Sequence, residues 1–128
     1  MSSFVLAPSE TDPVQETLLG EALEHAPIGA IVLDETGRYL AANRMACRLT
    51  GYAREELLEA GPRALAAEPE KVPAALEQMA NGGLKHGTGS MRCRDGSFID
   101  IAYRVGPTRS GGLPHFVLVF WELEPAAT

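Results

Sequence analysis

The segment Gly29–Tyr52 decides the fold, and it reads GAIVLDETGRYLAANRMACRLTGY. Its apolar run Ile31–Leu33 favours a strand, and the polar residues after it, which end in Gly37, suit a tight turn back into a second strand. Asn43 follows that strand and can cap a helix, because its side-chain oxygen accepts hydrogen bonds from backbone amides two or three residues on. Gly51 supplies the left-handed conformation at which such a helix ends. The segment therefore predicts a hairpin followed directly by a capped helix.

This order of residues resembles the opening of a PAS domain, the small sensor and interaction fold of many signalling proteins. In that family a strand ending in Asp and a turn glycine lead through a second strand to Asn, a short helix, Gly-Tyr and Glu-Glu-Leu. The matching residues, at the family's spacing, are Asp34, Gly37, Asn43, Gly51, Tyr52, Glu55, Glu56 and Leu57. The resemblance continues to about Glu124. It has two departures, since Met45 stands where the family often has Ala, and Ala53 stands where a Ser or Thr usually caps the next helix.

The bulk properties limit the class of protein. With 128 residues, of which 45% are hydrophobic, the chain is long enough for one domain with its own core. A net charge of -6 and a pI near 5.0 disfavour binding to nucleic-acid backbones and to anionic membranes. The first residues lack the basic and apolar segments of a signal peptide, so we expect a cytoplasmic protein. The two cysteines, Cys47 and Cys93, have no metal or redox spacing and are expected to be buried and unpaired.

A helix is predicted ahead of the hairpin. Residues 1–11 are expected to form a flexible arm, and Asp12 can cap a flanking helix over 12–26 that has Pro13 at its first position. The apolar residues of this helix are Val14, Leu18, Leu19, Ala22 and Leu23. They cover about half of the circumference, wider than the stripe of about 100° that one packing surface needs. Two contact surfaces are therefore implied.

Two more helices and three more strands are predicted after the hairpin and its helix. We expect a short helix over 54–58 that Gly61-Pro62 breaks, and a second helix from about 70 to 81. Between them lies an Ala-rich connector over 63–69, in which the resemblance implies a helical turn. The strands are expected over 84–93, 98–105 and 115–123, with a loop over 106–112. This order predicts an α+β fold, a PAS-like five-stranded antiparallel sheet with helices packed on one face and an N-terminal flanking helix. The PAS domain then spans residues 27–124, and residues 125–128 form a tail.

No catalytic or metal-binding constellation is present in the sequence. The chain has no nucleophile elbow, phosphate loop or paired metal-ligand spacing, and His25, His86 and His115 stand far apart. We therefore expect no enzymatic activity and no metal site.

The resemblance raises the question of a cofactor. In the haem-binding branch a His usually comes from the long helix before the third strand, and residues 54–82 contain no His. In the flavin-binding light sensors the reactive Cys lies in an Asn-Cys-Arg-Phe-Leu-Gln run, and residues 48–92 contain no Cys, which also removes the attachment site of the photoactive yellow type. We predict no cofactor, and a haem held through Met79 or His86 or a bound flavin is the alternative.

The core between sheet and helices either is fully packed or holds a small apolar ligand. A packed core is the simpler expectation, while ligand pockets of this kind are lined by hydrophobic side chains with few polar groups. The candidate lining residues are Met45, Leu49, Leu76, Met79, Ile101 and Tyr103.

The last strand is apolar on both faces, so a partner must cover the face that the domain's own helices do not reach. We assign the row that ends in Trp121 to this contact and pair it with the N-terminal helix in a homodimer. The candidate interface residues are Val14, Leu18, Ala22, Val117, Val119 and Trp121. In the PAS family the last strand often ends in Asp-Ile-Thr, through which it connects to an effector, and Glu122 takes the place of the acid. The resemblance thus implies a homodimeric sensor or interaction module that is part of, or partner to, a histidine kinase of a two-component system or a transcriptional regulator.

Overall fold

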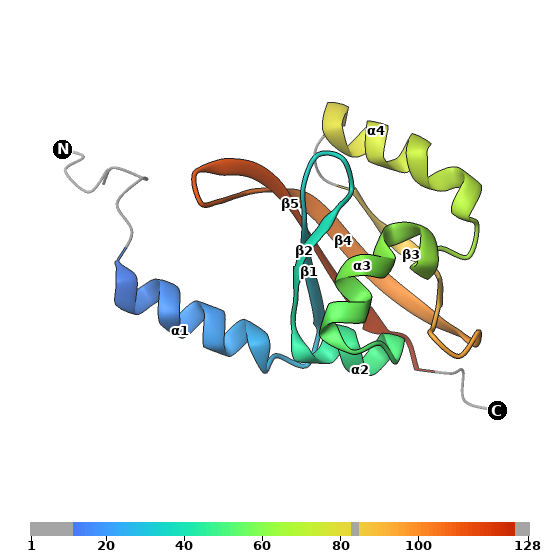
Figure 1. Ribbon diagram of the computed structural model, residues 1–128, viewed down its shortest axis with the longest axis horizontal. Helices are drawn as coiled ribbons and strands as arrows, with labels where there is room; N and C mark the ends of the chain where they lie inside the picture. The colour runs from blue at the N-terminus through green and yellow to red at the C-terminus, as the bar shows by residue number, and fades with distance from the viewer. Residues whose placement is uncertain (1–11, 83–84, 125–128) are drawn as a thin grey trace.

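The computed structural model describes residues 12–82 and 85–124. In chain order its elements are α1 (Pro13–Glu24), β1 (Gly29–Leu33), β2 (Tyr39–Ala42), α2 (Arg44–Thr50), α3 (Arg54–Leu65), the 3-10 turn η1 (Pro69–Lys71), α4 (Val72–Gly82), β3 (Lys85–Arg92), β4 (Phe98–Ser110) and β5 (Leu113–Glu122). The strands form one antiparallel sheet in the order β2-β1-β5-β4-β3. Helices α2, α3 and α4 lie over one face of it, and α1 extends away from the domain (Figure 1). The predicted α+β fold is confirmed.

The β1–β2 turn is held by one carboxylate. Asp34 Oδ1 accepts hydrogen bonds from the Thr36 backbone N (2.9 Å), the Thr36 hydroxyl (2.6 Å) and the Arg38 backbone N (3.0 Å). Gly37 adopts φ +90°, a conformation that L side chains rarely take. The Thr36 hydroxyl, and after it the backbone amides, hold the pKa of Asp34 below its ordinary value. The predicted hairpin is confirmed together with the reason for its acid and its glycine.

Asn43 connects four segments of the chain. Its Oδ1 accepts from the backbone N of Ala46 (3.0 Å), which caps α2, and from the backbone N of Ala30 in β1 (2.9 Å). Its Nδ2 donates to the carbonyls of Leu23 (2.6 Å) and Ile28 (2.9 Å). The predicted cap is thus also the joint between α1, β1 and α2.

The segment after Tyr52 differs from the predicted short helix. Residues 54–65 are helical on both sides of a kink at Gly61, which has φ +71° and ψ −174°. Pro62 lacks a backbone N–H and begins the second half, where the first amides have no helical partner in any case. The expected helical turn in the connector is η1, and α4 follows at Val72, two residues after the predicted start. The sequence predicts that this helix ends near Asn81, and its last described residue is Gly82; Gly83 lies outside the described residues.

The predicted loop over 106–112 is wrong. Strand β4 continues to Ser110 and pairs with β5, which starts at Leu113, so only Gly111 and Gly112 form the turn. Both have positive φ (59° and 78°), the combination that a two-residue hairpin turn requires. Pro107, opposite Phe116 of β5, lies beyond the described pairing of β4 with β3, which ends at Val105.

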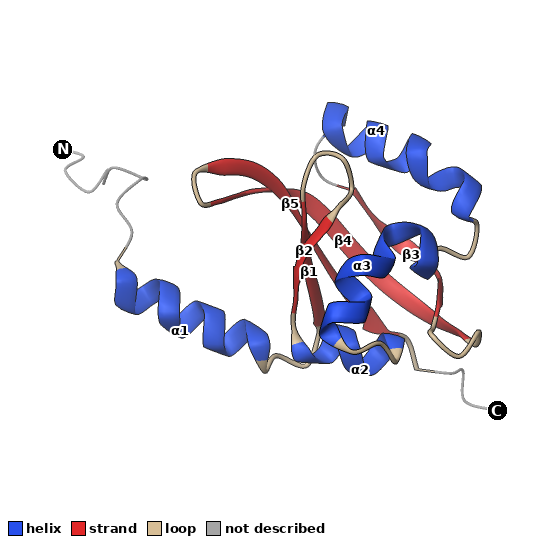
Figure 2. Cartoon of the chain, in the orientation of Figure 1, coloured by secondary structure: helices blue, strands red, loops and turns tan. Residues whose placement is uncertain are grey.

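The core lies between the sheet and the helices. On β5, Phe116 and Phe120 are buried and Leu118 packs against the same cluster, so this row faces the helices. The alternate row, Val117, Val119 and Trp121, is therefore on the opposite face, which we call the outer face. Figure 2 shows that α1 leaves most of the sheet uncovered on this side. None of the described helices is long and apolar enough to cross a membrane.

Candidate functional site: an apolar cavity under α4

A cavity of about 260 Å³ lies between α4, the end of α3 and the inner face of the sheet. Its wall is formed by Leu33, Tyr39, Pro62, Leu65, Ala66, Val72, Ala75, Leu76, Met79, Lys85, Ser90, Met91, Ile101, Tyr103, Val105 and Leu118. Residues 72, 75, 76 and 79 are spaced as one face of a helix, and residues 101, 103 and 105 are one face of a strand. The helical spacing of α4 and the alternation of β4 thus direct these side chains toward the same cavity.

Bare backbone in β3 makes room for the cavity. The inward row of β3 contains Lys85, Gly87, Gly89 and Met91, and only Met91 of these is a buried apolar side chain. A Cβ atom on Gly89 would meet nothing within 4 Å, and one on Gly87 would lie 3.4 Å from the Tyr103 hydroxyl. The two glycines therefore add no side chain to the space between β3 and α4, although neither lines the cavity itself.

The polar groups of the wall are few. Tyr39 is buried, and burial raises the pKa of its phenol, which keeps the hydroxyl protonated and able to donate. Tyr103 is half-buried with its hydroxyl next to β3. Lys85 is half-buried, and its Nζ donates to Gln78 Oε1 of α4. The site therefore combines an apolar wall with two phenols, the Ser90 hydroxyl and one ammonium group, a composition typical of a small-molecule pocket.

The structure brings together four of the six predicted lining residues, Leu76, Met79, Ile101 and Tyr103. Leu49 lies elsewhere, in a groove that it shares with Cys93 near the β3–β4 turn. Met45 is half-buried on α2 and lines none of the cavities found among the described residues. These two were misplaced because helical spacing shows that α2 packs on the sheet but not that it packs at the end away from α4 (Figure 1).

Sequence reasoning missed Tyr39, Lys85 and Val105. Val105 could have been found, because it continues the alternation of Ile101 and Tyr103 by two residues. Tyr39 and Lys85 stand at strand ends, where the sequence gives no signal for the direction in which a side chain points.

The wall, as far as it is described, lacks a His to ligate haem iron and a Cys to form a covalent flavin adduct. Its described residues include no His and no Cys, and His86 belongs to the row of β3 that faces away from the helices. Cys93 Sγ donates to the Leu49 carbonyl (3.4 Å), and burial raises the pKa of both Cys93 and Cys47. No group of three or more metal-binding side chains occurs among the described residues. Met79 is the one predicted haem ligand in the wall, and no step is derived through haem or flavin.

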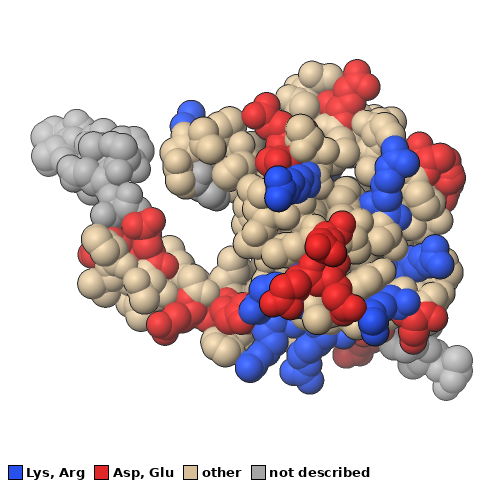
Figure 3. All heavy atoms as spheres, viewed as in Figure 1, with Lys and Arg blue, Asp and Glu red and all other residues tan. Residues whose placement is uncertain are grey.

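The second candidate surface consists of α1 and the outer face. Val14 and Leu18 are 64% and 56% exposed, Ala22 is exposed, and no residue of α1 is buried. Val117 and Val119 are half-buried, and Trp121 is 38% exposed. Figure 3 shows acidic side chains on α1 and basic ones around α2.

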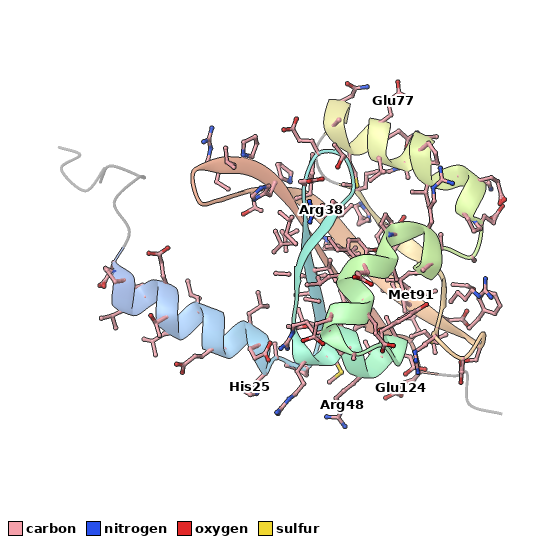
Figure 4. All side chains as sticks on the ribbon, in the orientation of Figure 1. His25, Arg38, Arg48, Glu77, Met91 and Glu124 are labelled. Atoms are coloured by element: carbon pink, nitrogen blue, oxygen red, sulfur yellow. The ribbon has the colours of Figure 1, made fainter. Side chains whose placement is uncertain are left out.

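Helix α1 is tied to the domain at its C-terminal end alone, among the described contacts. Besides the bond from Asn43 to Leu23, Arg54 Nη2 pairs with Glu24 Oε2 at 2.7 Å, and Arg44 Nη1 lies 3.4 Å from His25 Nδ1. Figure 4 shows His25 at this joint. The first two turns of α1 are therefore free to meet a partner.

The family model described as PAS fold matches residues 17–122. A search of curated proteins finds no match. Among solved structures, the chain is similar to the PAS domain of an HTR-like protein from Haloarcula marismortui, with a TM-score of 0.75 and 20% identity over 87% of this chain and 93% of that one. It is also similar to a domain of a sensory box sensor histidine kinase/response regulator from Geobacter sulfurreducens (0.73, 22%, 87% and 97%).

A third similar structure is the PAS domain, in complex with ethanol, of a LuxR-family transcriptional regulator from Burkholderia thailandensis (TM-score 0.68, 16% identity, 81% of this chain and 96% of that one). At these identities the structural likeness shows the fold alone.

Proposed function

Because this chain belongs to the PAS fold family, we propose that it is a signal-transduction sensor domain that holds a small ligand without a covalent bond and acts as a homodimer. The cavity under α4 is the observation that carries the proposal. It is apolar, it is large enough for a small organic molecule, and its wall offers hydroxyl groups to orient one. No catalytic activity is proposed, since the signal would be carried by binding.

The likeness to a PAS domain that was solved with ethanol supports a small neutral or weakly polar ligand. An alcohol could place its hydroxyl against Tyr39 or Tyr103 and its apolar part against Leu76 and Met79. Such a ligand would bridge α4 and the sheet, so its arrival would change how firmly α4 is held.

An NMR titration with benzyl alcohol, monitored through the methyl signals of Met79 and Met91, tests the ligand proposal. We expect saturable shifts in the wild-type protein. Ala75→Trp points a large side chain into the cavity and should abolish them, whereas Ala74→Trp, on the neighbouring position outside the wall, should not. Shifts that do not saturate, or that survive Ala75→Trp, would reject the site. A visible spectrum of the same samples tests for haem or flavin.

For the homodimer, we propose that α1 and the outer face of one protomer cover those of the other. The exposed apolar row of α1 and the row of Trp121 both need cover, and an isologous pair supplies it for both copies. The acidic α1 has no Lys or Arg, so the contact would rest on apolar area rather than on charge pairing.

Light scattering on three variants tests the dimer. Deletion of residues 1–20 keeps Leu23 and its bond to Asn43, so the fold should persist while the dimer is lost. Trp121→Glu should have the same effect. Leu40→Glu, which changes an apolar residue of similar exposure (39%) that lies beside Leu58 of α3, should leave the dimer intact. A wild-type chain that is monomeric at tens of micromolar contradicts the proposal.

The output would go to a histidine kinase or a transcriptional regulator, as part of the same protein or as a partner. The likeness to a domain of a sensor histidine kinase/response regulator supports this class. Placing the chain in the sensor position of a histidine kinase and measuring autophosphorylation with and without benzyl alcohol tests the coupling. Equal rates in both conditions would reject it.

A further inference from the structure

Among the described residues that line the cavity, Lys85 alone is charged. It stands in the first position of β3, opposite Val105, in the row that faces the helices. Its neighbours in that row are Gly87 and Gly89, so no side chain on its own strand separates its ammonium group from the open space. The hydrogen bond of this ammonium group is exposed, so the charge stands at the rim of the apolar wall.

The partner of this ammonium group carries no charge. Lys85 Nζ donates to the amide oxygen of Gln78, and none of the ion pairs among the described residues includes Lys85. Glu77, the neighbouring acid on α4, points away from the sheet in Figure 4. The positive charge is thus held at the cavity by a hydrogen bond and is left without a carboxylate.

Tyr103 brings a second donor to the same face of the sheet. Its hydroxyl would lie 3.4 Å from a Cβ on Gly87, the residue two positions after Lys85 on the same face. Tyr103 and Lys85 are diagonal neighbours across the β3–β4 ladder, about 7–8 Å apart at the backbone, a separation that two long side chains can close. An ammonium and a phenol on such neighbouring positions can each donate to one oxygen of a bound carboxylate.

We infer that the cavity selects a small monocarboxylate, with Lys85 and Tyr103 binding the carboxylate and the wall under α4 enclosing an apolar aromatic or branched body. The volume sets the size, because about 260 Å³ equals the liquid volume of about nine waters, and so a ligand of about nine or ten non-hydrogen atoms. A dicarboxylate would leave its second charge against the apolar wall without a partner, and a cation would face Lys85 with no acid to offset it.

This inference rests on the proposed ligand-binding function, and a pair of probes separates the two. Benzoate and benzamide have the same shape and differ in charge. By isothermal titration calorimetry we expect the wild-type protein to bind benzoate at least about tenfold more tightly than benzamide, the size of effect typical of a hydrogen bond to a charged group.

Variants assign the effect to the two residues. Lys85→Met keeps the aliphatic stem and should remove the preference for benzoate while leaving the affinity for benzamide unchanged; Lys85→Arg should restore much of it. Tyr103→Phe should weaken benzoate by a few-fold. Lys71→Met, in η1 and outside the wall, is the matched control and should change neither affinity.

Benzamide bound as tightly as benzoate, or a Lys85→Met protein with unchanged preference, overturns the inference. If benzyl alcohol binds and benzoate does not, the inference alone fails and the ligand-binding function stands. If neither benzyl alcohol, benzoate nor benzamide binds, both fail. Circular dichroism of each variant confirms that its fold is intact, and Lys85→Gln, which also removes the charge, takes the place of Lys85→Met should that variant not fold.

Discussion

Leu76 of α4 lies directly against Gly37 in the β1–β2 turn, so closely that a Cβ atom on Gly37 would come within 2.6 Å of Leu76 Cδ1. Leu76 also forms part of the cavity wall. The helix that covers the cavity is therefore seated on the turn that Asp34 holds. A shift of α4 on ligand binding would therefore first change the contact between Leu76 and Gly37.

Gly37→Ala is expected to destabilise the domain more than Gly96→Ala. Both glycines have nearly the same φ (+90° and +89°), but a Cβ on Gly96 would meet nothing within 4 Å. The backbone strain of about 1–2 kcal/mol is common to both, and only Gly37→Ala must also displace Leu76. Denaturant unfolding measures the difference.

Adding Leu76→Ala to Gly37→Ala removes the clash and should bring the cost of the glycine substitution down to that of Gly96→Ala. Equal losses for the two single glycine variants would mean that Leu76 moves aside freely and that α4 does not depend on the turn.

Asn43→Ala is expected to lower the free energy of unfolding by about 3 kcal/mol or more. The substitution leaves the buried amides of Ala30 and Ala46 without their acceptor, and each unpaired buried group costs about 1–3 kcal/mol. It also releases the Leu23 carbonyl, so hydrogen exchange at the end of α1 should become faster. Asn81→Ala, at an exposed amide near the end of α4, is the control and should change little. A loss below 1 kcal/mol would contradict the role of Asn43 as a joint.

The local features of the fold were readable from the sequence because short-range chemistry determines them. Asp34, Gly37, Asn43 and Gly51 each satisfy their role with backbone groups a few residues away. The strand conformation at the end of β4, over residues 106–110, could not be predicted in this way. Its Gly, Pro, Thr, Arg and Ser composition predicts a loop, and only pairing with β5, a partner with its own strong strand signal, makes it a strand.

The cavity was readable in part, for a similar reason. Periodicity identified Leu76, Met79, Ile101 and Tyr103, since each lies in the middle of a regular element. It could not show how much space remains between α4 and the inner row of β3, because that space depends on how the two elements face each other across the core. For the same reason a cavity could not be distinguished from a packed core.

The contribution of Asp34 to stability is expected to depend on pH. Its pKa is lowered in the folded protein, so the stabilisation is complete above the unfolded value of about 4 and is lost as the pH falls through the lower folded value. The difference in unfolding midpoint between wild type and Asp34→Asn should therefore shrink as the pH is lowered from 7 toward 2.5. Thr36→Val removes the hydroxyl that makes the largest contribution and should raise the pKa of Asp34 in an NMR titration. A difference that stays constant or widens in acid would show that the charge of Asp34 is not what holds the turn.

Ala53→Ser is expected to stabilise the protein by about 0.5–2 kcal/mol. Ala53 is the N-cap of α3, with an extended backbone (φ −69°, ψ 157°) and no side-chain acceptor, while Glu56 Oε1 already accepts from the Ala53 backbone N at 2.9 Å. A serine hydroxyl at this exposed position can accept from the backbone N of Glu56 and complete the reciprocal pair. Ala53→Thr and Ala53→Val provide the matched test, because valine has the shape of threonine without the oxygen. We expect the denaturant midpoint to rise for the serine and threonine variants and not to rise for the valine variant. A serine variant with an unchanged or lower midpoint would mean that water already satisfies the first amides of α3 at no cost.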